Sequence, residues 1–315
     1  MRVLVTGGAG FIGSNLAHAL ITGGHQVGVI DDLSTGAFEN LHPHAWSRTL
    51  DILDPGFPAL VAEFAPDAVV HLAAQASVSV SLKDPERDWA VNAEGTRVAA
   101  RAAREAGAKR MISASSAAVY GEPLPSDLPL VEAAHKSPVN PYGRSKLAAE
   151  GLLASELTGS GVDYASFRFS NVYGPRQDGA GEGGVVAIFC TRMHAGEPPV
   201  VYGTGAQTRD FIYVGDVVAA IIAALSSDSP LAGEGPDGAA YNISTGREAS
   251  VDALLLALRQ ASGYLGGVDH EPARAGDVDR SSLSPAKAAG VLGWAAGQPL
   301  DNGAAVTWRW FASRS

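Results

Sequence analysis

A glycine-rich turn near the amino terminus constrains the fold of this chain more than any other feature. The run VLVTGGAGFIGSNL places Gly7, Gly10 and Gly13 between a short β-branched segment and a segment with apolar residues at helical spacing. Glycine permits a tight turn and close approach of backbone to a pyrophosphate, and the following helix start offers free N–H groups. The turn therefore predicts a dinucleotide-binding strand–loop–helix unit. The letters also fit a second register, Gly8-x-Gly10-x-x-Gly13, so the string alone leaves the register open.

Strand and helix patterns alternate through the first half of the chain. The segments typical of buried strands are RVLVT, QVGVI, DAVVHLAA, RMISASS and VDYASFRFSNVYG. Amphipathic or alanine-rich helical patterns separate them, among them a long one over residues 85–107. This alternation predicts an α/β fold, a Rossmann-type doubly wound parallel sheet with helices on both faces.

The second half is less regular and predicts a smaller lobe. Residues 181–205 and 234–250 mix short apolar runs with Gly/Pro loops, and we expect short strands there. We predict a nucleotide-binding domain over residues 1–171, with a return of the chain near 205–232. A carboxy-terminal α/β substrate lobe would then comprise residues 172–204 and 233–315.

An acidic residue closes the second predicted strand. Asp31 stands roughly 20 residues beyond the glycines, where a carboxylate accepts hydrogen bonds from the adenosine ribose and repels a 2′-phosphate. Asp32 follows, and neither position is an arginine. The sequence therefore favours NAD over NADP as the cofactor.

The overall composition restricts the partners and the compartment. A net charge of -10 disfavours nucleic acid or an anionic membrane surface as a partner. No signal peptide or membrane-spanning run is visible, and the eight histidines show no metal-ligand spacing, so we expect no metal. Cys190 is the only cysteine, which excludes an internal disulfide and fits a cytoplasmic location. It lies in an apolar run, and we expect it to be a buried small hydrophobe.

A tyrosine and a lysine stand four residues apart in SPVNPYGRSKLAAEGL. Asn140 suits a helix cap and Pro141 the first helical position, so Tyr142 and Lys146 share one face of the predicted helix. A phenol with a pKa of about 10 is a poor base at neutral pH, but a neighbouring ammonium favours the phenolate. The pair is therefore a candidate acid–base site; the alternative is an exposed tyrosine beside a solvated lysine.

Seven motifs together resemble a known family. TGGAGFIGS, DDLSTG, HLAAQASV, SASSAAVYG, PYGRSK, RFSNVYGPRQ and TRDFIYVGDVV occur in the order seen in extended short-chain dehydrogenase/reductases. The match is closest to the UDP-galactose 4-epimerase branch of the nucleotide-sugar epimerases and extends from residue 1 to about residue 294. The resemblance implies the register Gly7-x-x-Gly10-x-x-Gly13 and a set of NAD-contacting positions. These are Gly7, Gly10, Phe11, Ile12, Gly13, Asp31, Asp32, Ser34, Thr35, Gly36, Asp51, Ile52, Leu72, Ala73, Ala74, Gln75, Asn92, Ala114, Tyr142, Lys146 and Phe169.

The resemblance also implies a catalytic set and a reaction. Ser116 would hydrogen-bond the reacting oxygen, Tyr142 would take a proton from the sugar hydroxyl, and Lys146 would hold the nicotinamide ribose. Related 4,6-dehydratases carry an Asp-Glu pair where this chain has Ala117 and Ala118. Alanine can neither give nor take a proton, so the family reaction left is inversion of C4 of a UDP-hexose through a transient 4-keto sugar.

The family's substrate positions carry over in the same way. They fall on Ser77, Ser116, Tyr142, Asn171, Val185, Val186, Val200, Tyr202, Gln207, Arg209, Arg274, Asp277 and Ser281. Arginines suit a diphosphate because their donors form a fork. The small side chain of Ser281, at a gatekeeper position, predicts room for a 2-acetamido group, so we expect UDP-GlcNAc and UDP-GalNAc to be substrates beside UDP-glucose and UDP-galactose.

Three alternatives stay open at this point. UDP-glucuronate is the nearest rival substrate, because Ser77 and Ser79 offer hydroxyls to a carboxylate. A nucleotide-sugar oxidoreductase with net redox would exchange its cofactor with solvent, whereas an epimerase would keep it. A non-catalytic dinucleotide sensor is disfavoured because such relatives usually lose the Tyr or the Lys. The family also implies a homodimer, formed through the Tyr142 helix and the long helix before it.

Overall fold

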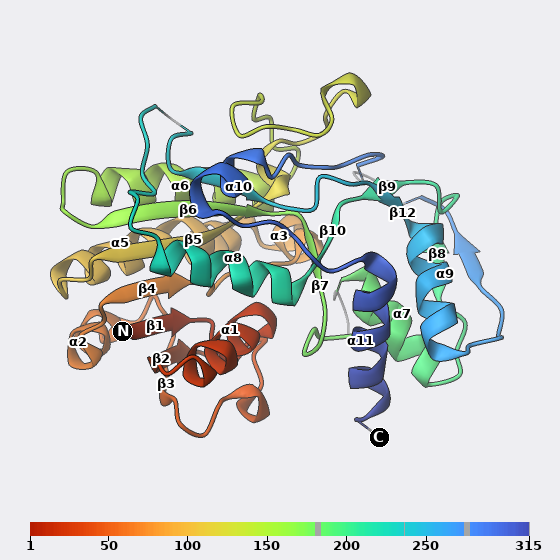
Figure 1. Ribbon diagram of the computed structural model, residues 1–315, viewed down its shortest axis with the longest axis horizontal. Coiled ribbons are helices and arrows are strands. Elements are labelled where there is room, and N and C mark those ends of the chain that lie inside the picture. Colours follow the sequence, from red (N-terminus) through yellow and green to blue (C-terminus); the bar gives the residue numbers. More distant parts are fainter. Residues whose placement is uncertain (180–183, 236, 274–277, 315) are drawn as a thin grey trace.

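The computed structural model describes residues 1–179, 184–235, 237–273 and 278–314, and its centre is one parallel sheet. The seven strands are ordered β11-β6-β5-β4-β1-β2-β3, and each pairs in parallel with its neighbours. Their bounds are β1 Arg2–Thr6, β2 Gln26–Asp31, β3 Trp46–Thr49, β4 Ala68–His71, β5 Arg110–Ser116, β6 Asp163–Phe169 and β11 Ala240–Ile243. The predicted α/β doubly wound fold is confirmed (Figure 1).

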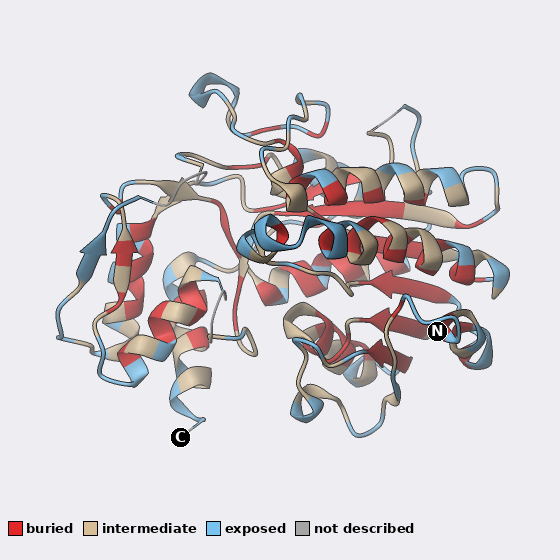
Figure 2. Ribbon diagram, turned by 180° about the vertical axis from the view of Figure 1, so that it is seen from behind, coloured by how far each residue is buried: buried red, intermediate tan, exposed pale blue. Residues whose placement is uncertain are grey.

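Helices cover both faces of this sheet, because successive strand residues point to opposite faces. In β1, Val3 and Val5 belong to a cluster with α1 and α8, while Leu4 belongs to a second cluster with α2, α5 and α6. Both clusters are buried, as the red strands of Figure 2 show. The bounds are α1 Phe11–Thr22, α2 Phe57–Phe64, α5 Gly95–Glu105, α6 Pro141–Leu157 and α8 Val214–Ser226.

The helix before β5 is continuous but changes its winding. The segments α4 (Pro85–Trp89), a π-helical turn (Ala90–Glu94) and α5 follow one another without a break, as the predicted helix over 85–107 requires. A short helix α3 (Val78–Lys83) precedes them. Three 3-10 turns complete this half of the chain: Phe38–Asn40, Ala117–Val119 and Pro125–Asp127.

The smaller lobe packs its own hydrophobic cluster beside the sheet body, at the right of Figure 1. Its helices are α7 Val185–His194, α9 Val251–Ser262 and α11 Leu300–Ala312. Its short strands, with those of the crossing segment, are β7 Asn171–Tyr173, β8 Val200–Tyr202, β9 Thr208–Arg209, β10 Phe211–Tyr213, β12 Ala249–Ser250 and β13 Asp269–Glu271. They pair as β10-β7, β12-β9 and β13-β8.

The sequence missed the helix α7. Short strands and loops were expected over 181–205, but residues 185–194 are helical and bury Val186, Phe189, Cys190 and Met193. These positions recur at helical spacing, a signal that the flanking glycines and prolines obscured. Cys190 is fully buried, as expected of a small hydrophobe.

The body takes more of the carboxy-terminal half than the predicted return near 205–232. Strand β11 lies within the range assigned to the lobe, yet it pairs with β6 as an edge of the main sheet. Helix α10 (Ala286–Leu292) and Trp294 also pack against the α8 face of the body. Local pattern shows that β11 is a strand but carries no information about its partner strand. Within the described ranges, no helix combines the length and apolar character that crossing a bilayer requires.

Candidate active site

The glycine turn leaves the start of α1 clear of side chains. Gly7 has φ +70°, and a Cβ there would lie 2.6 Å from the Ala73 nitrogen. A Cβ on Gly13 would lie 2.1 Å from the Gly7 carbonyl oxygen, and one on Gly8 2.6 Å from Val29. Gly7, Gly8 and Gly13 are therefore all required for the turn to pack, whether the motif is counted from Gly7 or from Gly8. Gly10 caps α1 without a side chain, and the first turn of the helix carries no acidic residue. Free N–H groups and the positive end of the helix dipole suit the pyrophosphate of a dinucleotide.

Asp31 is fixed by the backbone around this turn. Its Oδ2 accepts a hydrogen bond from the Ala9 N–H and its Oδ1 one from the Leu33 N–H, both at 2.8 Å. Burial raises the pKa of the Asp31 carboxyl, and these hydrogen bonds oppose the rise. Asp32 accepts from the N–H and the hydroxyl of Ser34, which shapes the loop that continues to Thr35 and Gly36. The predicted ribose-binding residues thus form one turn at the end of β2.

Ser116, Tyr142 and Lys146 meet at the carboxyl end of β5. Strand β5 ends at Ser116, and α6 begins beside it, capped by a 2.8 Å hydrogen bond from the Gly143 N–H to Asn140 Oδ1. Lys146 Nζ lies 6.0 Å from the centre of the Tyr142 ring, and Ser116 and Tyr142 are joined by a side-chain hydrogen bond. The structure therefore brings the predicted catalytic set together, with the cap that the sequence predicted.

The electrostatics of this set differ from the expectation. Burial is the largest influence on Tyr142 and raises its pKa, whereas the hydrogen bond with Ser116 lowers it and the charge of Asp88 raises it further. Burial also lowers the pKa of Lys146 to about 8, opposed by the charges of Asp88 and Glu150. The sequence predicted a phenol made more acidic by the ammonium. In the protein alone, burial raises the pKa of the phenol, and the influence that opposes this rise is the hydrogen bond with Ser116, not the ammonium.

A second hydrogen-bonded group holds the loop after β4, which contains the predicted residues Leu72, Ala73, Ala74 and Gln75. The Gln75 N–H donates to Asn92 Oδ1 and the Asn92 amide donates to the Gln75 carbonyl, both at 3.0 Å. Asn92 is 1% exposed and lies on the π-helical turn. Its side chain therefore fixes the loop, and its predicted contact with the cofactor stays a prediction.

Several predicted residues lie in hydrophobic cores. Ile52 and Phe169 are buried in the body, and Phe169 pairs with Ser116 across β5 and β6. Val186 is 2% exposed and packs inside the small lobe, with Val185 partly buried against the same cluster. This packing explains the apolar side chain of Val186 without a contact to the sugar.

Most of the predicted substrate-binding residues outside the catalytic set lie on the small lobe and the segments crossing to it. Gln207 Nε2 donates to the Tyr202 carbonyl at 2.6 Å, next to Val200 on β8. Arg209 donates to the Thr208 carbonyl at 2.8 Å. The remaining positions are Asn171 on β7, Ser77 at the cap of α3 and the half-buried Ser281. Arg274 and Asp277 lie outside the described residues.

Sequence reasoning missed four polar residues that line the back of the site. Asp88, Ser145, Ser81 and His71 are all buried, and each contacts a predicted site residue or its neighbour. His71 Nδ1 lies 2.7 Å from the Thr6 hydroxyl, and burial together with the charge of Lys146 lowers its pKa to about 3. For Asp88, Ser145 and Ser81 the available signal was a polar residue on a buried helix face, and for His71 it was a histidine at the end of an apolar strand. The partners of these residues come from distant segments, which the sequence pattern does not show.

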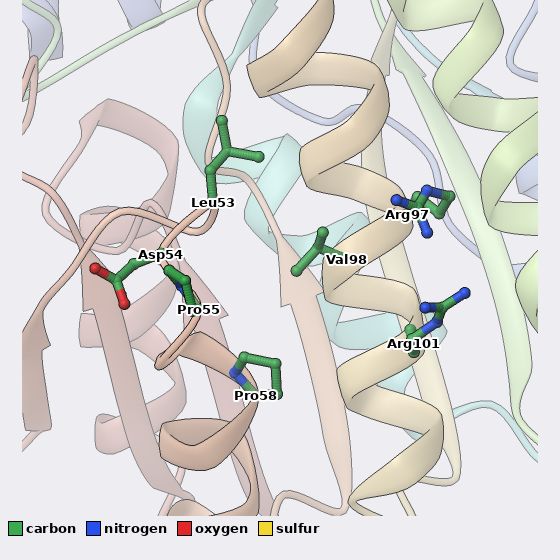
Figure 3. A pocket seen from close by; sticks show the side chains of 7 residues that line it. All are labelled: Leu53, Asp54, Pro55, Pro58, Arg97, Val98 and Arg101. Atoms are coloured by element: carbon green, nitrogen blue, oxygen red, sulfur yellow. The ribbon is translucent and has the colours of Figure 1, made fainter.

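A surface hollow on the flank of the body is separate from this site. It has a volume of about 240 Å³ and lies between the segment around Pro55 and helix α5 (Figure 3). Arg97 and Arg101 line it and also pair with Glu156 on α6. Among the predicted site residues that the structure describes, none lines this hollow.

Known proteins resemble this chain over its full length. It is 41% identical to a UDP-glucose 4-epimerase of Mycolicibacterium smegmatis over the full length of both chains. The structure of a Thermus thermophilus UDP-glucose 4-epimerase in complex with NAD matches with a TM-score of 0.92 and 38% identity, covering 100% of both chains. A UDP-N-acetylglucosamine 4-epimerase of Methanobrevibacter ruminantium matches with a TM-score of 0.91 and 32% identity, covering 100% of this chain and 99% of that one.

The family model confirms the resemblance that the motifs indicated. The NAD dependent epimerase/dehydratase family matches residues 3–244, which include the glycine turn, Asp31, Ser116, Tyr142 and Lys146. The chain belongs to the NAD dependent epimerase/dehydratase family.

Proposed function

We propose that this chain is an NAD-dependent nucleotide-sugar 4-epimerase that inverts C4 of a UDP-hexose, UDP-glucose or UDP-galactose, through a transient 4-keto sugar. The observation that carries the proposal is the convergence of Ser116, Tyr142 and Lys146 at the carboxyl end of β5. Parallel α/β sheets bind their ligands at this end of the strands.

The residues present fit NAD. The bare start of α1 suits a pyrophosphate, and Asp31 at the end of β2 suits an unphosphorylated ribose. Lys146 keeps ammonium protons beyond the one donated to Ala114, and these would hold the nicotinamide ribose. Bound there, NAD would supply the acceptor, and afterwards the donor, of the hydride that the sugar carbon exchanges.

The chain's own residues would move the proton that accompanies this exchange. The Tyr142 phenol oxygen would take the proton from the C4 hydroxyl and later give it back, and the Ser116 hydroxyl would hydrogen-bond the same oxygen. A buried neutral phenol is a poor base, so positive charge close to it would have to favour its phenolate. Lys146 would supply one such charge.

The residues after Ser116 favour epimerisation over loss of water. Ala117 and Ala118 form a 3-10 turn, and the Ala118 N–H donates to Ser116 Oγ at 3.2 Å. Neither alanine offers an acid or a base at the sugar. The 4-keto sugar would therefore rotate and be reduced again, and the nucleotide would serve as the anchor during rotation.

The substrate range is the finer part of the proposal. We expect UDP-GlcNAc and UDP-GalNAc to be accepted too, because Ser281 has a small side chain and a relative is named a UDP-N-acetylglucosamine 4-epimerase. We also expect a cytoplasmic homodimer. The cytoplasm suits a chain whose single cysteine is buried and unpaired, and α5 with α6 offers a continuous helical face for a second copy.

A substrate panel tests the proposed function. Purified protein is given UDP-glucose, UDP-galactose, their 2-acetamido forms and UDP-glucuronate without added NAD, and the C4 epimers are resolved by chromatography. We expect epimers from the first four sugars. Epimerisation of UDP-glucuronate alone would identify the rival substrate, and turnover only with added NAD in stoichiometric amounts would identify a net oxidoreductase.

A further inference from the structure

A buried carboxylate lies directly behind the catalytic helix. Asp88, on α4, is 1% exposed. Its Oδ1 accepts hydrogen bonds from Gln75 Nε2 at 2.7 Å and Asn92 Nδ2 at 3.1 Å, and its Oδ2 accepts one from Ser145 Oγ at 2.6 Å. In the part of the chain that the structure describes, every one of these donors is neutral. A buried carboxylate with neutral partners is costly, which requires an explanation.

These hydrogen bonds join three segments of the site. Gln75 belongs to the loop after β4, Asn92 to the π-helical turn, and Ser145 to α6, adjacent to Lys146. The Ser145 hydroxyl also lies 3.0 Å from the Tyr142 carbonyl oxygen. Asp88 therefore links the loop predicted to line the dinucleotide to the first turn of the catalytic helix.

The first turn of α6 is held from a second direction as well. The Tyr142 N–H donates to Ser81 Oγ at 3.2 Å, and the Ser81 hydroxyl donates to the Val78 carbonyl at 2.7 Å. Helix α3 thus fixes the backbone of Tyr142, while Asp88 fixes the following turn. Such supporting contacts decide whether reacting groups are held in productive geometry.

Asp88 also acts through its charge. The charged groups that face Lys146 are Asp88 from α4 and Glu150 from α6, which favour the ammonium; His71 from β4 is neutral, and Tyr142 lies on the same helix. The same charge of Asp88 disfavours the Tyr142 phenolate. The charge of Asp88 therefore raises the pKa of Lys146 and the pKa of Tyr142. Loss of this charge should lower both pKa values.

We propose that Asp88 is a positioning residue of the epimerase, which ties the cofactor-lining loop to the catalytic helix through Ser145 and keeps Lys146 cationic. The proposal rests on the proposed function, in which Tyr142 and Lys146 carry the reaction. Its two parts, geometry and charge, predict different pH profiles for different variants.

The charge is tested with Asp88→Asn. In a plot of turnover against pH, we expect both the acid limb, where turnover rises, and the alkaline limb, where it falls, to move to lower pH. The alkaline limb should move by about one pH unit, because the nearby negative charge is lost. The control is Glu86→Gln, which makes the same charge change on the exposed side of the same helix, and its profile should match that of the wild type. A fall in turnover with unmoved limbs, or an equal shift in the control, would overturn the role of the charge.

The geometry is tested with Ser145→Ala and Asp88→Glu, which keep the carboxylate. We expect turnover about tenfold lower with both limbs in place, because the catalytic turn is less firmly held. Wild-type turnover in Ser145→Ala would overturn the positioning role. If Asp88→Asn does not fold, Asp88→Glu tests the role of the charge instead. This variant keeps the negative charge, so a displaced pH limb in Asp88→Glu would contradict that role.

A measurement without turnover separates this proposal from the proposed function. The unfolding free energy of the wild type should rise with pH from about 8, where Lys146 loses its proton in the folded state. In Asp88→Asn this rise should begin at lower pH. An unchanged onset would refute the Asp88 proposal even if the epimerase is active, and a shifted onset would support it even if the substrate panel fails.

Discussion

Lys146 Nζ donates a hydrogen bond to the backbone carbonyl of Ala114, 3.0 Å away, and so joins the catalytic helix to the strand that ends at Ser116. The lysine is 4% exposed. An ammonium in this position has given up most of its hydration in exchange for one carbonyl and the more distant charges of Asp88 and Glu150. Its burial is therefore a cost to the folded protein that only function explains.

Replacement of Lys146 by methionine should stabilise the free protein at neutral pH while it abolishes turnover. The pKa of Lys146 falls from 10.5 to about 8 on folding, so the unfolded chain binds more protons between these values. The unfolding free energy of the wild type should therefore rise with pH over this window. The unfolding free energy of Lys146→Met should exceed it by at most about 3 kcal/mol at pH 7, and this difference should shrink between the two pKa values. Denaturant unfolding across pH measures this. Lys109→Met, at an exposed position, should show no such trend.

Asp31→Ala should weaken NAD binding by at least about tenfold. The predicted effect on affinity comes from loss of the acceptor for the adenosine ribose, since a hydrogen bond to a charged group is worth about 1.5–3 kcal/mol. The carboxylate also accepts from the Ala9 and Leu33 N–H groups, so its loss loosens the turn that holds the ribose site. Titration calorimetry with NAD measures the change. Asp54→Asn is the control. Asp54 is exposed, and its Oδ1 accepts a hydrogen bond from the Gly56 N–H two residues on, as Asp31 does from the Leu33 N–H. Undiminished affinity in Asp31→Ala would remove Asp31 from the cofactor site.

Arg168→Met should cost about 3 kcal/mol of stability, because it removes the buried cation that joins two partly buried carboxylates. The guanidinium is fully buried and pairs with Glu150 at 2.6 Å and Asp237 at 2.8 Å. Arg48→Met breaks an exposed pair with Glu63 and should cost no more than about 1 kcal/mol. Urea unfolding of both variants tests the contrast, and equal costs would show that burial of the Arg168 network does not matter.

Local signals in the sequence predicted the framework of the site. The alternation of strand and helix, the Asn140 cap and the carboxylate at the end of β2 all depend on neighbours in the chain, and the structure has each of them. The motifs then placed the chain in its family, which the comparisons confirm. These features are encoded within a few residues of one another.

Features that depend on distant partners were not predictable in the same way. Asp88 meets Ser145 across 57 residues, and β11 joins β6 after the chain has passed through the small lobe. The direction of the Tyr142 pKa shift was also missed, because burial depends on how the whole site is enclosed. A sequence shows which side chains can ionise but not how far each is removed from water.

The turnover of Tyr142→Phe on UDP-galactose, at pH 8 and with NAD content measured in the same sample, tests the proposed role of the phenol most directly. We predict a fall of at least about 10²-fold with NAD binding unchanged, because only the proton-transferring oxygen is lost. Tyr164→Phe, which removes a phenol hydroxyl bonded to Thr158, should leave turnover unaltered. Full turnover in Tyr142→Phe would contradict the mechanism.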